Sequence, residues 1–183
     1  EVVVRARKIL TDVQDLKDYA QQLSQPLTGP LRLGIIPSIA PYLLPKILPE
    51  LARLHPDLKL TVRETLTATL TEELVAGRLD AIVIALPVDN QALESAPIFI
   101  DRFLLARHKD PDSDLRHKVA PSELETENIL LLEEGHCLRE QALNYCQNLP
   151  APNASSLGAT SLATVMQMVS AGYGVTLLPE ICA

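Results

Sequence analysis

The sequence contains little of what a small secreted domain or a metal site needs. Only three cysteines occur among its 183 residues, and they show no regular pairing. This excludes a secreted scaffold held together by disulfides and favours reduced thiols in a cytosol. Because no C-x-x-C motif is present and no fourth ligand accompanies His136 and the cysteines, we expect neither a metal site nor a cofactor.

Basic clusters, aromatic residues and long apolar runs are also scarce. Sixteen basic residues stand against 23 acidic ones, for a formal charge of −7, and only four Tyr and two Phe are available for stacking. The chain by itself is therefore a poor nucleic-acid binder. Its longest apolar run, residues 81–88, is far below the ~18 residues that a membrane span needs, and the N-terminal pattern is not that of a signal peptide. We expect a cytoplasmic protein without membrane contact.

The first pattern in the chain is a heptad repeat. Apolar residues separated alternately by four and three positions are typical of a coiled-coil seam. They predict a linker or dimerisation helix over residues 1–26, which pairs with a second copy or lies on its own domain. Pro26 and the Thr28-Gly29-Pro30 cluster predict its end. The seam consists of Val2, Ala6, Ile9, Val13, Leu16, Ala20 and Leu23.

Two further regions alternate between strand-like and helix-like patterns. Residues 31–97 predict strands at 31–36, 58–64 and 79–85 and helices at 41–55 and 67–76, with a kink or break at Pro49 and an end at Gly77. Residues 98–183 predict strands at 98–106, 129–132 and 175–179, a linker at 149–156 and a helix at 162–171. This order predicts an α/β fold in two lobes, the first built on a parallel sheet with right-handed crossovers.

Two cysteines stand nine positions apart in a stretch with a helical pattern, Glu133 to Cys146. On a continuous α-helix, nine residues turn through ~900° and rise roughly 13 Å, so the sulfur atoms of Cys137 and Cys146 would point to opposite faces. A disulfide needs Cα atoms no more than about 7 Å apart. The stretch cannot be an intact helix and a Cys137–Cys146 disulfide at once, which is the physical outline of a redox switch.

The surroundings of these two cysteines differ. We expect Cys137 in or just before the first helical turn, with His136 beside it and Arg139 two residues later. Cations and helix N-termini favour the thiolate, whereas the two preceding glutamates oppose it if they point inward. Cys146 has no such neighbours. The asymmetry suggests one attacking and one resolving cysteine.

A purely structural interpretation stays open beside this one. Free cysteines are often inert core residues, and Cys137 and Cys146 fit that description too. His136 alone would suit a solvated turn. Cys182, just after a strand pattern, is expected to be structural.

Several stretches resemble a known family. The heptad helix, residues 31–37 followed by Ser38, residues 79–83 and the closing residues 171–179 are similar to the linker helix and effector domain of LysR-type transcriptional regulators. Within that family, residues 132–139 with Cys146, followed by residues 159–162, resemble the OxyR subfamily of hydrogen peroxide sensors. The first match covers nearly the whole chain. The second is short but specific, because it includes both cysteines and their spacing.

The resemblance implies a two-lobed effector domain like the periplasmic binding proteins, with lobe I in residues 31–97 and lobe II, carrying the redox switch, in residues 98–183. It implies that Cys137 is the peroxidatic cysteine and Cys146 its resolving partner, and that His136 and Arg139 help to hold Cys137. It also implies that two hydroxyls bind peroxide and water. These belong to Thr67 and to Ser38, where the family usually has Thr.

The resemblance further implies a regulator and not an enzyme. Its partners would be hydrogen peroxide, a second copy of itself in a homodimer or homotetramer, and a thiol reductant such as glutaredoxin or thioredoxin. Promoter DNA and RNA polymerase would be contacted by the parent protein, whose winged helix-turn-helix we expect outside this chain.

Two alternatives stay open. A LysR-type sensor of a small organic effector would use the cleft between the lobes, where Ser38, Thr67 and Ser161 stand at predicted helix N-termini suited to an anion. A thiol peroxidase would share the cysteine chemistry but turn over with a thiol reductant.

Overall fold

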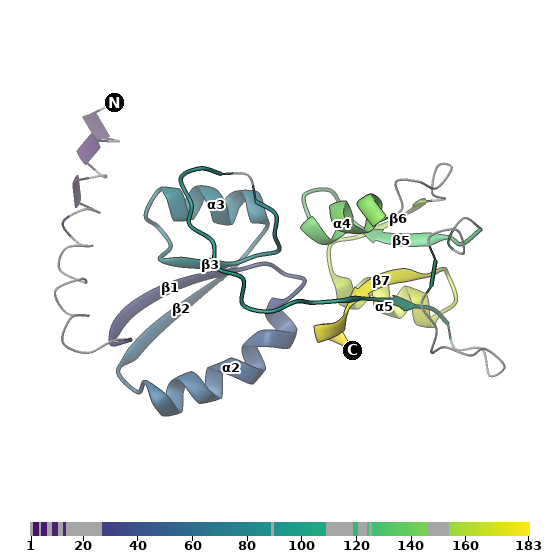
Figure 1. Cartoon of the computed structure of the whole chain (residues 1–183), viewed down its shortest axis with the longest axis horizontal. Coiled ribbons are helices and arrows are strands. Elements are labelled where there is room, and N and C mark those ends of the chain that lie inside the picture. Colours follow the sequence, from purple (N-terminus) through teal and green to yellow (C-terminus); the bar gives the residue numbers. More distant parts are fainter. Residues whose placement is uncertain are drawn as a thin grey trace. The chain divides into compact units, whose positions relative to one another are not determined.

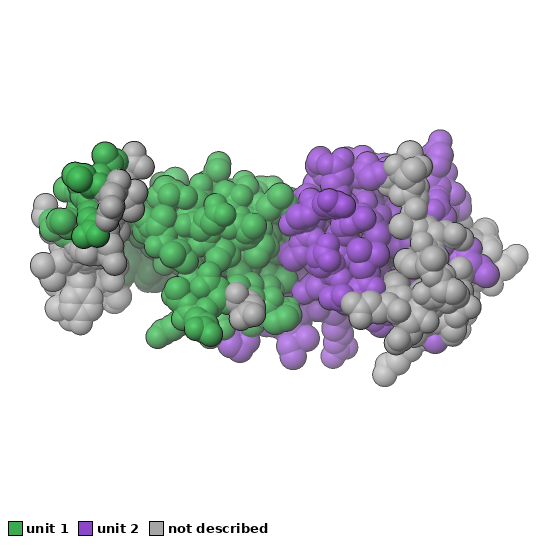
Figure 2. All heavy atoms as spheres, turned by 90° about the horizontal axis from the view of Figure 1, so that it is seen from above, with its two compact units in different colours: residues 1–95 green, residues 96–183 purple. Residues whose placement is uncertain are grey.

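The computed structural model describes residues 2, 3, 5, 6, 9, 10, 13, 27–88, 90–108, 119, 120, 124, 126–145 and 154–183. The chain divides into two compact units, Glu1–Ser95 and Ala96–Ala183 (Figure 1, Figure 2). No helix in the described part of the chain is both long and apolar enough to cross a membrane. Each unit has its own strands and helices.

The start of the chain is helical where it is described. Residues 2, 3, 5, 6, 9, 10 and 13 are helical, and their apolar side chains are exposed, Val2 to 80% and Val13 to 47%. The rest of the helix predicted over residues 1–26, including its end at Pro26, lies outside the described residues. Exposed apolar side chains in a stripe favour a partner surface, so dimerisation through this helix stays a prediction.

Unit 1 contains a parallel sheet with one helix on each face (Figure 1). The strand order is β2-β1-β3, with Ile35 paired to both Glu64 and Val83. β2 lies on one side of β1, and the chain then crosses to β3 on the other side. Because these two crossovers run in opposite directions and both are right-handed, they place the two helices on opposite faces of the sheet. This confirms the predicted β-α-β-α-β order. The elements are β1 (Gly29–Ile35), α2 (Ala40–Leu54), β2 (Leu58–Glu64), α3 (Thr67–Val75) and β3 (Ala81–Val83).

Two glycines shape this unit. Gly77, with φ +66°, follows α3 in the left-handed conformation that commonly ends helices, as predicted. Gly34 lies in β1 under α3, where an added Cβ would come within 2.6 Å of Leu70 Cδ2 and 2.8 Å of Leu79 Cδ1. Both leucines are buried, so the absence of a side chain at Gly34 allows the close packing of helix on sheet.

The break predicted as one possibility at Pro49 is not found. α2 runs without interruption from Ala40 to Leu54, with Pro45 and Pro49 inside it. Each proline lacks an amide hydrogen and leaves the carbonyl four residues earlier without a helical donor. Pro41, Pro45 and Pro49 are spaced by four, so they share one face, and all three are exposed. Carbonyls on that face are open to water, which reduces the cost of the missing hydrogen bonds.

Unit 2 has its strands in two pairs. β4 pairs with β7 in antiparallel orientation, β5 pairs with β6 in parallel, and a bridge between Ile129 and Val175 joins β5 to the segment that leads into β7. The elements are β4 (Phe103–Ala106), β5 (Ile129–Leu132), α4 (Cys137–Tyr145), β6 (Ala154–Ala159), α5 (Leu162–Ser170), β7 (Thr176–Pro179) and the 3-10 turn η2 (Glu180–Cys182).

The core of unit 2 surrounds β5. All four residues of this strand are buried, and α4, which follows it, packs back on it through Ala142. The second half of α4 is thereby held against the centre of the unit, and Leu138 near the start of the helix is buried as well. We call the following buried residues the β5 core: Leu124, Ile129, Leu131, Ala142, Val175 and Leu177.

Three predicted boundaries in these units are wrong. β6 begins at Ala154, inside the predicted 149–156 linker, because pairing with β5 makes a strand of Ala-Ser-Ser residues that have little intrinsic preference for one. The predicted strand 98–106 is shortened to β4, and Ile98 and Ile100 before it are 68% and 91% exposed. The strand predicted at 79–85 is reduced to β3.

Candidate functional site

The candidate site begins where β5 ends. Four buried apolar residues carry the chain to the carboxyl end of the strand, and Glu133 and Glu134 then emerge into solvent. Gly135 has φ +91°, a conformation that glycine adopts without steric cost. The turn returns His136 to the interior, where it is 8% exposed, and α4 starts at Cys137.

Cys137 is a free, half-buried thiol on the first residue of α4. The carbonyl oxygen of His136 accepts hydrogen bonds from the amides of Arg139 at 3.0 Å and Glu140 at 3.4 Å, so the helical hydrogen bonds begin immediately before the cysteine. The first amides of a helix lack intrahelical acceptors and give that end a partial positive charge, which stabilises an anion. The predicted position of Cys137 in the first helical turn is confirmed.

The length of α4 keeps a disulfide from forming while the helix is intact. α4 ends at Tyr145, whose Cα lies roughly 12 Å along the axis from that of Cys137. One further residue moves the chain by at most ~3.8 Å, so a gap of roughly 8 Å or more is left, and a disulfide needs about 7 Å or less. Cys146 itself lies outside the described residues. α4 must therefore open before Cys137 can be bonded to it.

His136 is held in its neutral form. Burial lowers the pKa of its imidazole, and the negative charge of Glu133 acts in the opposite direction. At neutral pH the ring is thus uncharged, and His136 offers hydrogen-bonding nitrogens next to Cys137 in the chain.

The lowered pKa of His136 predicts that the folded protein loses stability in mild acid. Below about pH 6.5 the unfolded chain binds the proton more readily than the folded one, so the free energy of unfolding falls as the pH falls. Well above that pH the ring is neutral in both states and contributes no pH dependence. We expect His136→Asn to flatten the fall between about pH 7.5 and 5.5, by at most ~1.4 kcal/mol per pH unit. Urea unfolding across this range measures the slope, and equal slopes for both proteins would contradict the prediction.

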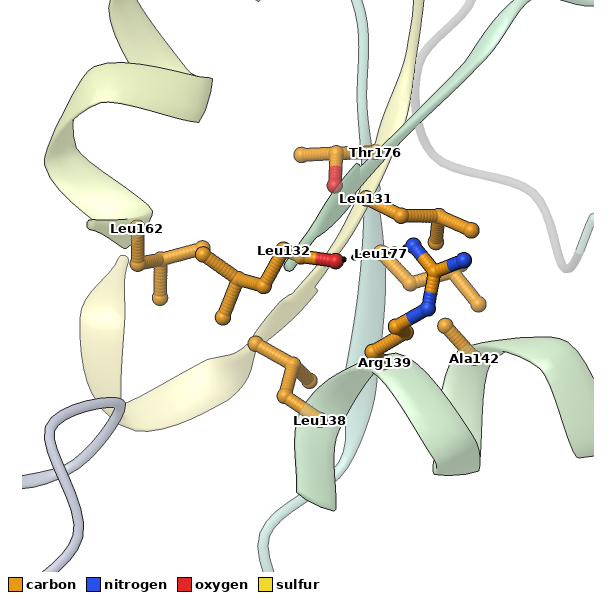
Figure 3. A pocket seen from close by; sticks show the side chains of 8 residues that line it. All are labelled: Leu131, Leu132, Leu138, Arg139, Ala142, Leu162, Thr176 and Leu177. Atoms are coloured by element: carbon orange, nitrogen blue, oxygen red, sulfur yellow. Dashed lines mark hydrogen bonds between the residues drawn. The ribbon is translucent and has the colours of Figure 1, made fainter. Parts of the chain in front are cut away.

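Arg139 contacts the end of β5. Its Nη1 donates a hydrogen bond to the carbonyl oxygen of Leu132 at 2.9 Å (Figure 3). A residue two positions along a helix points ~200° around the axis, so Arg139 and Cys137 leave α4 on opposite flanks of its buried residues, Leu138 and Ala142. Arg139 here fixes the turn between strand and helix, and its support of the thiolate stays a prediction.

A small pocket adjoins Arg139, between α4, β5, α5 and β7 (Figure 3). Its interior has room for about one water molecule and is lined mostly by leucines. Its one hydroxyl, on Thr176, already donates to the Leu130 carbonyl at 2.8 Å. Sites for small molecules usually measure about 300 Å³ or more, so this pocket is too small for a typical organic effector. The lining residues are Leu131, Leu132, Leu138, Arg139, Ala142, Leu162, Thr176 and Leu177.

The two predicted hydroxyls of unit 1 lie at one edge of its sheet. Ser38 is 5% exposed, in the turn between β1 and α2, and Thr67 is the first residue of α3, shortly after β2. β1 and β2 are parallel neighbours, so both residues follow carboxyl ends of strands, where α/β sheets bind ligands. Oγ1 of Thr67 is buried and has no hydrogen-bond partner among the described residues. Such an atom is unusual and makes Thr67 the stronger candidate of the two.

Ser161 has the corresponding place in unit 2. It precedes α5, shortly after β6, and is exposed. Leu132 of β5 pairs with Ala159 of β6, and the Glu133 amide donates to the Ala159 carbonyl at 3.0 Å. The starts of α4 and α5 therefore share one edge of the sheet. Ser38 and Thr67 belong to the other unit, so the use of Ser161 together with them in one effector site stays a prediction.

The far end of α4 makes a contact that no sequence pattern predicted. The hydroxyl of Tyr145 donates a hydrogen bond to the carbonyl oxygen of Val119 at 3.0 Å. The two residues are 26 positions apart, so no local spacing indicates it. Cys182 is buried in η2, and within the described ranges no three His, Cys, Asp or Glu side chains are grouped to hold a metal ion.

Comparisons with known proteins agree with this geometry. Residues 24–183 match the family model of the LysR substrate binding domain. The chain is 40% identical over 180 residues to the hydrogen peroxide-inducible genes activator of Dickeya chrysanthemi, covering 98% of this chain and 59% of that protein. It is 42% identical over 182 residues to the HTH-type transcriptional regulator EstR of Acinetobacter baylyi, covering 99% and 60%.

A solved structure supports the same assignment. The crystal structure of the reduced form of OxyR matches with a TM-score of 0.75 and 39% identity, over 86% of this chain and 73% of that chain. The chain spans only 59% to 60% of the length of the two curated relatives. With the family match over residues 24–183 and an OxyR structure of the same fold, the chain belongs to the LysR substrate-binding domain family.

Proposed function

We propose that this chain is the peroxide-sensing regulatory domain of a DNA-binding transcriptional regulator. The observation that carries the proposal is a free thiol, Cys137, on the first residue of a helix that must open before the thiol can form a disulfide with Cys146. Such a helix is a two-state element that oxidation can switch. The similarity to a hydrogen peroxide-inducible activator and to reduced OxyR supports the proposal.

The chemistry takes place in two balanced steps. The Cys137 thiolate attacks one oxygen of hydrogen peroxide, an S–O bond forms, the O–O bond breaks and hydroxide leaves, so that Cys137 becomes a sulfenic acid. The Cys146 thiol then attacks that sulfur, an S–S bond forms and water leaves. Two thiols thus supply the two electrons that reduce the peroxide. The thiolate of Cys137, and not its thiol, is the nucleophile of the first step.

The two end states can lie close enough in energy for oxidation to switch between them. Closing a loop of about ten residues restrains the unfolded segment by up to ~3 kcal/mol, whereas the opened helix loses its turns and its packing on the β5 core. Because these terms are comparable, the thiol redox potential decides which state is populated. The rearranged segment then re-orients the oligomer.

Peroxide binding is assigned to residues at the sheet edges. Ser38 and Thr67 are assigned to bind peroxide and water, and His136 and Arg139 are assigned to hold Cys137; the unpartnered Oγ1 of Thr67 supports the assignment of the hydroxyls most directly. The neutral imidazole of His136 can donate or accept a proton there.

The proposal extends to the parent protein. We infer that the parent protein acts in the cytoplasm as a homodimer or homotetramer, binds promoter DNA and contacts RNA polymerase. A thiol reductant such as glutaredoxin or thioredoxin reduces its disulfide again. The domain is a stoichiometric sensor and not a thiol peroxidase. Steady-state assays with peroxide and a thiol reductant should therefore give little continuous turnover.

Mass mapping after a peroxide pulse is the direct test. We expect a bond between the peptides that carry Cys137 and Cys146 in treated protein with blocked thiols, and no such bond in untreated protein. Cys182 should stay unlinked. Treated protein that lacks the Cys137–Cys146 bond would overturn the proposed function.

A second candidate function rests on the EstR relative, whose name does not mention peroxide. A sensor of a small organic effector would use Ser38, Thr67 and Ser161, which stand at or before the starts of helices. Titration calorimetry with small carboxylates separates the two functions. Binding heat together with indifference to peroxide would favour the organic effector.

A further inference from the structure

We propose that Tyr145 is a latch that keeps the end of α4 helical and thereby sets the rate at which the oxidised Cys137 is captured by Cys146. This inference rests on the function proposed above and adds a positioning residue to it. Tyr145 is not one of the two reacting residues. It acts on the helix that separates them.

The latch is a hydrogen bond from the last residue of α4 to a backbone carbonyl. The Tyr145 hydroxyl donates to the carbonyl oxygen of Val119 at 3.0 Å, and the side chain of Val119 packs against the β5 core. The acceptor therefore belongs to a residue that is itself packed on the β5 core. A donor on the helix bonded to such an acceptor resists movement of the helix end.

Burial holds the preceding part of α4. Ala142 is 3% exposed, and Leu143 packs against the same β5 core. The ring of Tyr145 is 42% exposed, so apolar packing holds the last residue less firmly than Ala142. The hydroxyl contact is thus placed where the helix would otherwise fray most easily.

Tyr145 is also the first residue that has to leave the helix. With α4 helical to Tyr145, the Cα atoms to be joined stay roughly 8 Å or more apart, beyond the limit of about 7 Å. With the helix ending one residue earlier, the axial separation is roughly 10.5 Å and two links of ~3.8 Å can close it. Release of Tyr145 is therefore the least change that permits the bond, and the latch acts on that residue.

Loss of the hydroxyl should therefore affect the second chemical step and not the first. A neutral hydrogen bond of this kind shifts an opening equilibrium by about 2- to 10-fold. Cys137 lies at the opposite end of α4, so its reaction with peroxide does not depend on the latch. The two rates can be measured separately.

Tyr145→Phe in the whole 183-residue chain is the test, with Tyr173→Phe as its control. Tyr173 is in the same unit, is 60% exposed, and its hydroxyl has no hydrogen-bond partner among the described residues. In the reduced protein, hydrogen exchange at the amides of residues 141–145 should be about 2- to 10-fold faster in Tyr145→Phe than in wild type. Tyr173→Phe should match wild type.

The same variants are then treated with hydrogen peroxide. Sulfenic acid formation, followed by a dimedone trap, should keep its wild-type rate, while disulfide formation should become about 2- to 10-fold faster in Tyr145→Phe. Unchanged hydrogen exchange, or two rates that change together, would overturn the latch. Faster exchange without any Cys137–Cys146 bond in wild type would uphold the contact as a helix tie and reject the proposed function instead.

Discussion

Replacing Cys137 with serine is expected to abolish oxidation by peroxide, with a rate loss of at least about 100-fold. The thiolate is the attacking species, and a serine hydroxyl is not deprotonated at neutral pH even at a helix N-terminus. Serine is well suited to the start of a helix, so the half-buried position should keep its fold. Trapping of sulfenic acid, read by mass spectrometry, measures the loss.

The two other cysteines supply the matched comparison. Cys146→Ser should leave a sulfenic acid on Cys137 that persists, because the thiol that would condense with it is gone. Cys182→Ser should behave as wild type, since Cys182 is buried in η2. Oxidation that survives Cys137→Ser, or that disappears in Cys182→Ser, would assign the sensor to another cysteine.

A methyl group at Gly174 is expected to destabilise unit 2 by about 2–4 kcal/mol. Its Cβ would lie 2.2 Å from the carbonyl oxygen of Asn128, a backbone atom that accepts the Val175 amide at 2.9 Å. The Asn128 side chain in turn donates to the Tyr173 carbonyl at 2.7 Å. Relief of the overlap must therefore pull apart the segment that leads into β5 and the segment that leads into β7, which are hydrogen-bonded to each other at this point.

Gly172 is the control for that substitution. Its φ is +81°, but an added Cβ would meet no atom within 4 Å, so Gly172→Ala should lose only the conformational term of about 1–2 kcal/mol. Urea unfolding of the two variants compares a steric overlap with a strained backbone. Equal destabilisation would mean that the Gly174 contact with Asn128 is not tight.

Local patterns were sufficient for most elements of this fold. β2, with its alternating residues 58–64, and α3, ended by Gly77, are found as predicted. β5 is as predicted too, because four consecutive apolar residues suit a strand that is buried on both faces. Where intrinsic preference was weak, as in the Ala-Ser-Ser start of β6, only the neighbouring strand decided the structure.

Some properties of the candidate site could likewise be predicted from local patterns, and others could not. The local pattern was enough to predict that Cys137 stands at the start of a helix, and that an intact helix there excludes a disulfide with Cys146, because chain geometry alone sets those distances. Three further properties could be found only in the folded protein: the burial of His136 that lowers its pKa, the hydrogen bond from Arg139 to the Leu132 carbonyl, and the hydrogen bond from Tyr145 to Val119. These properties depend on which distant segments pack around α4. The spacing of residues along the chain does not indicate which segments these are.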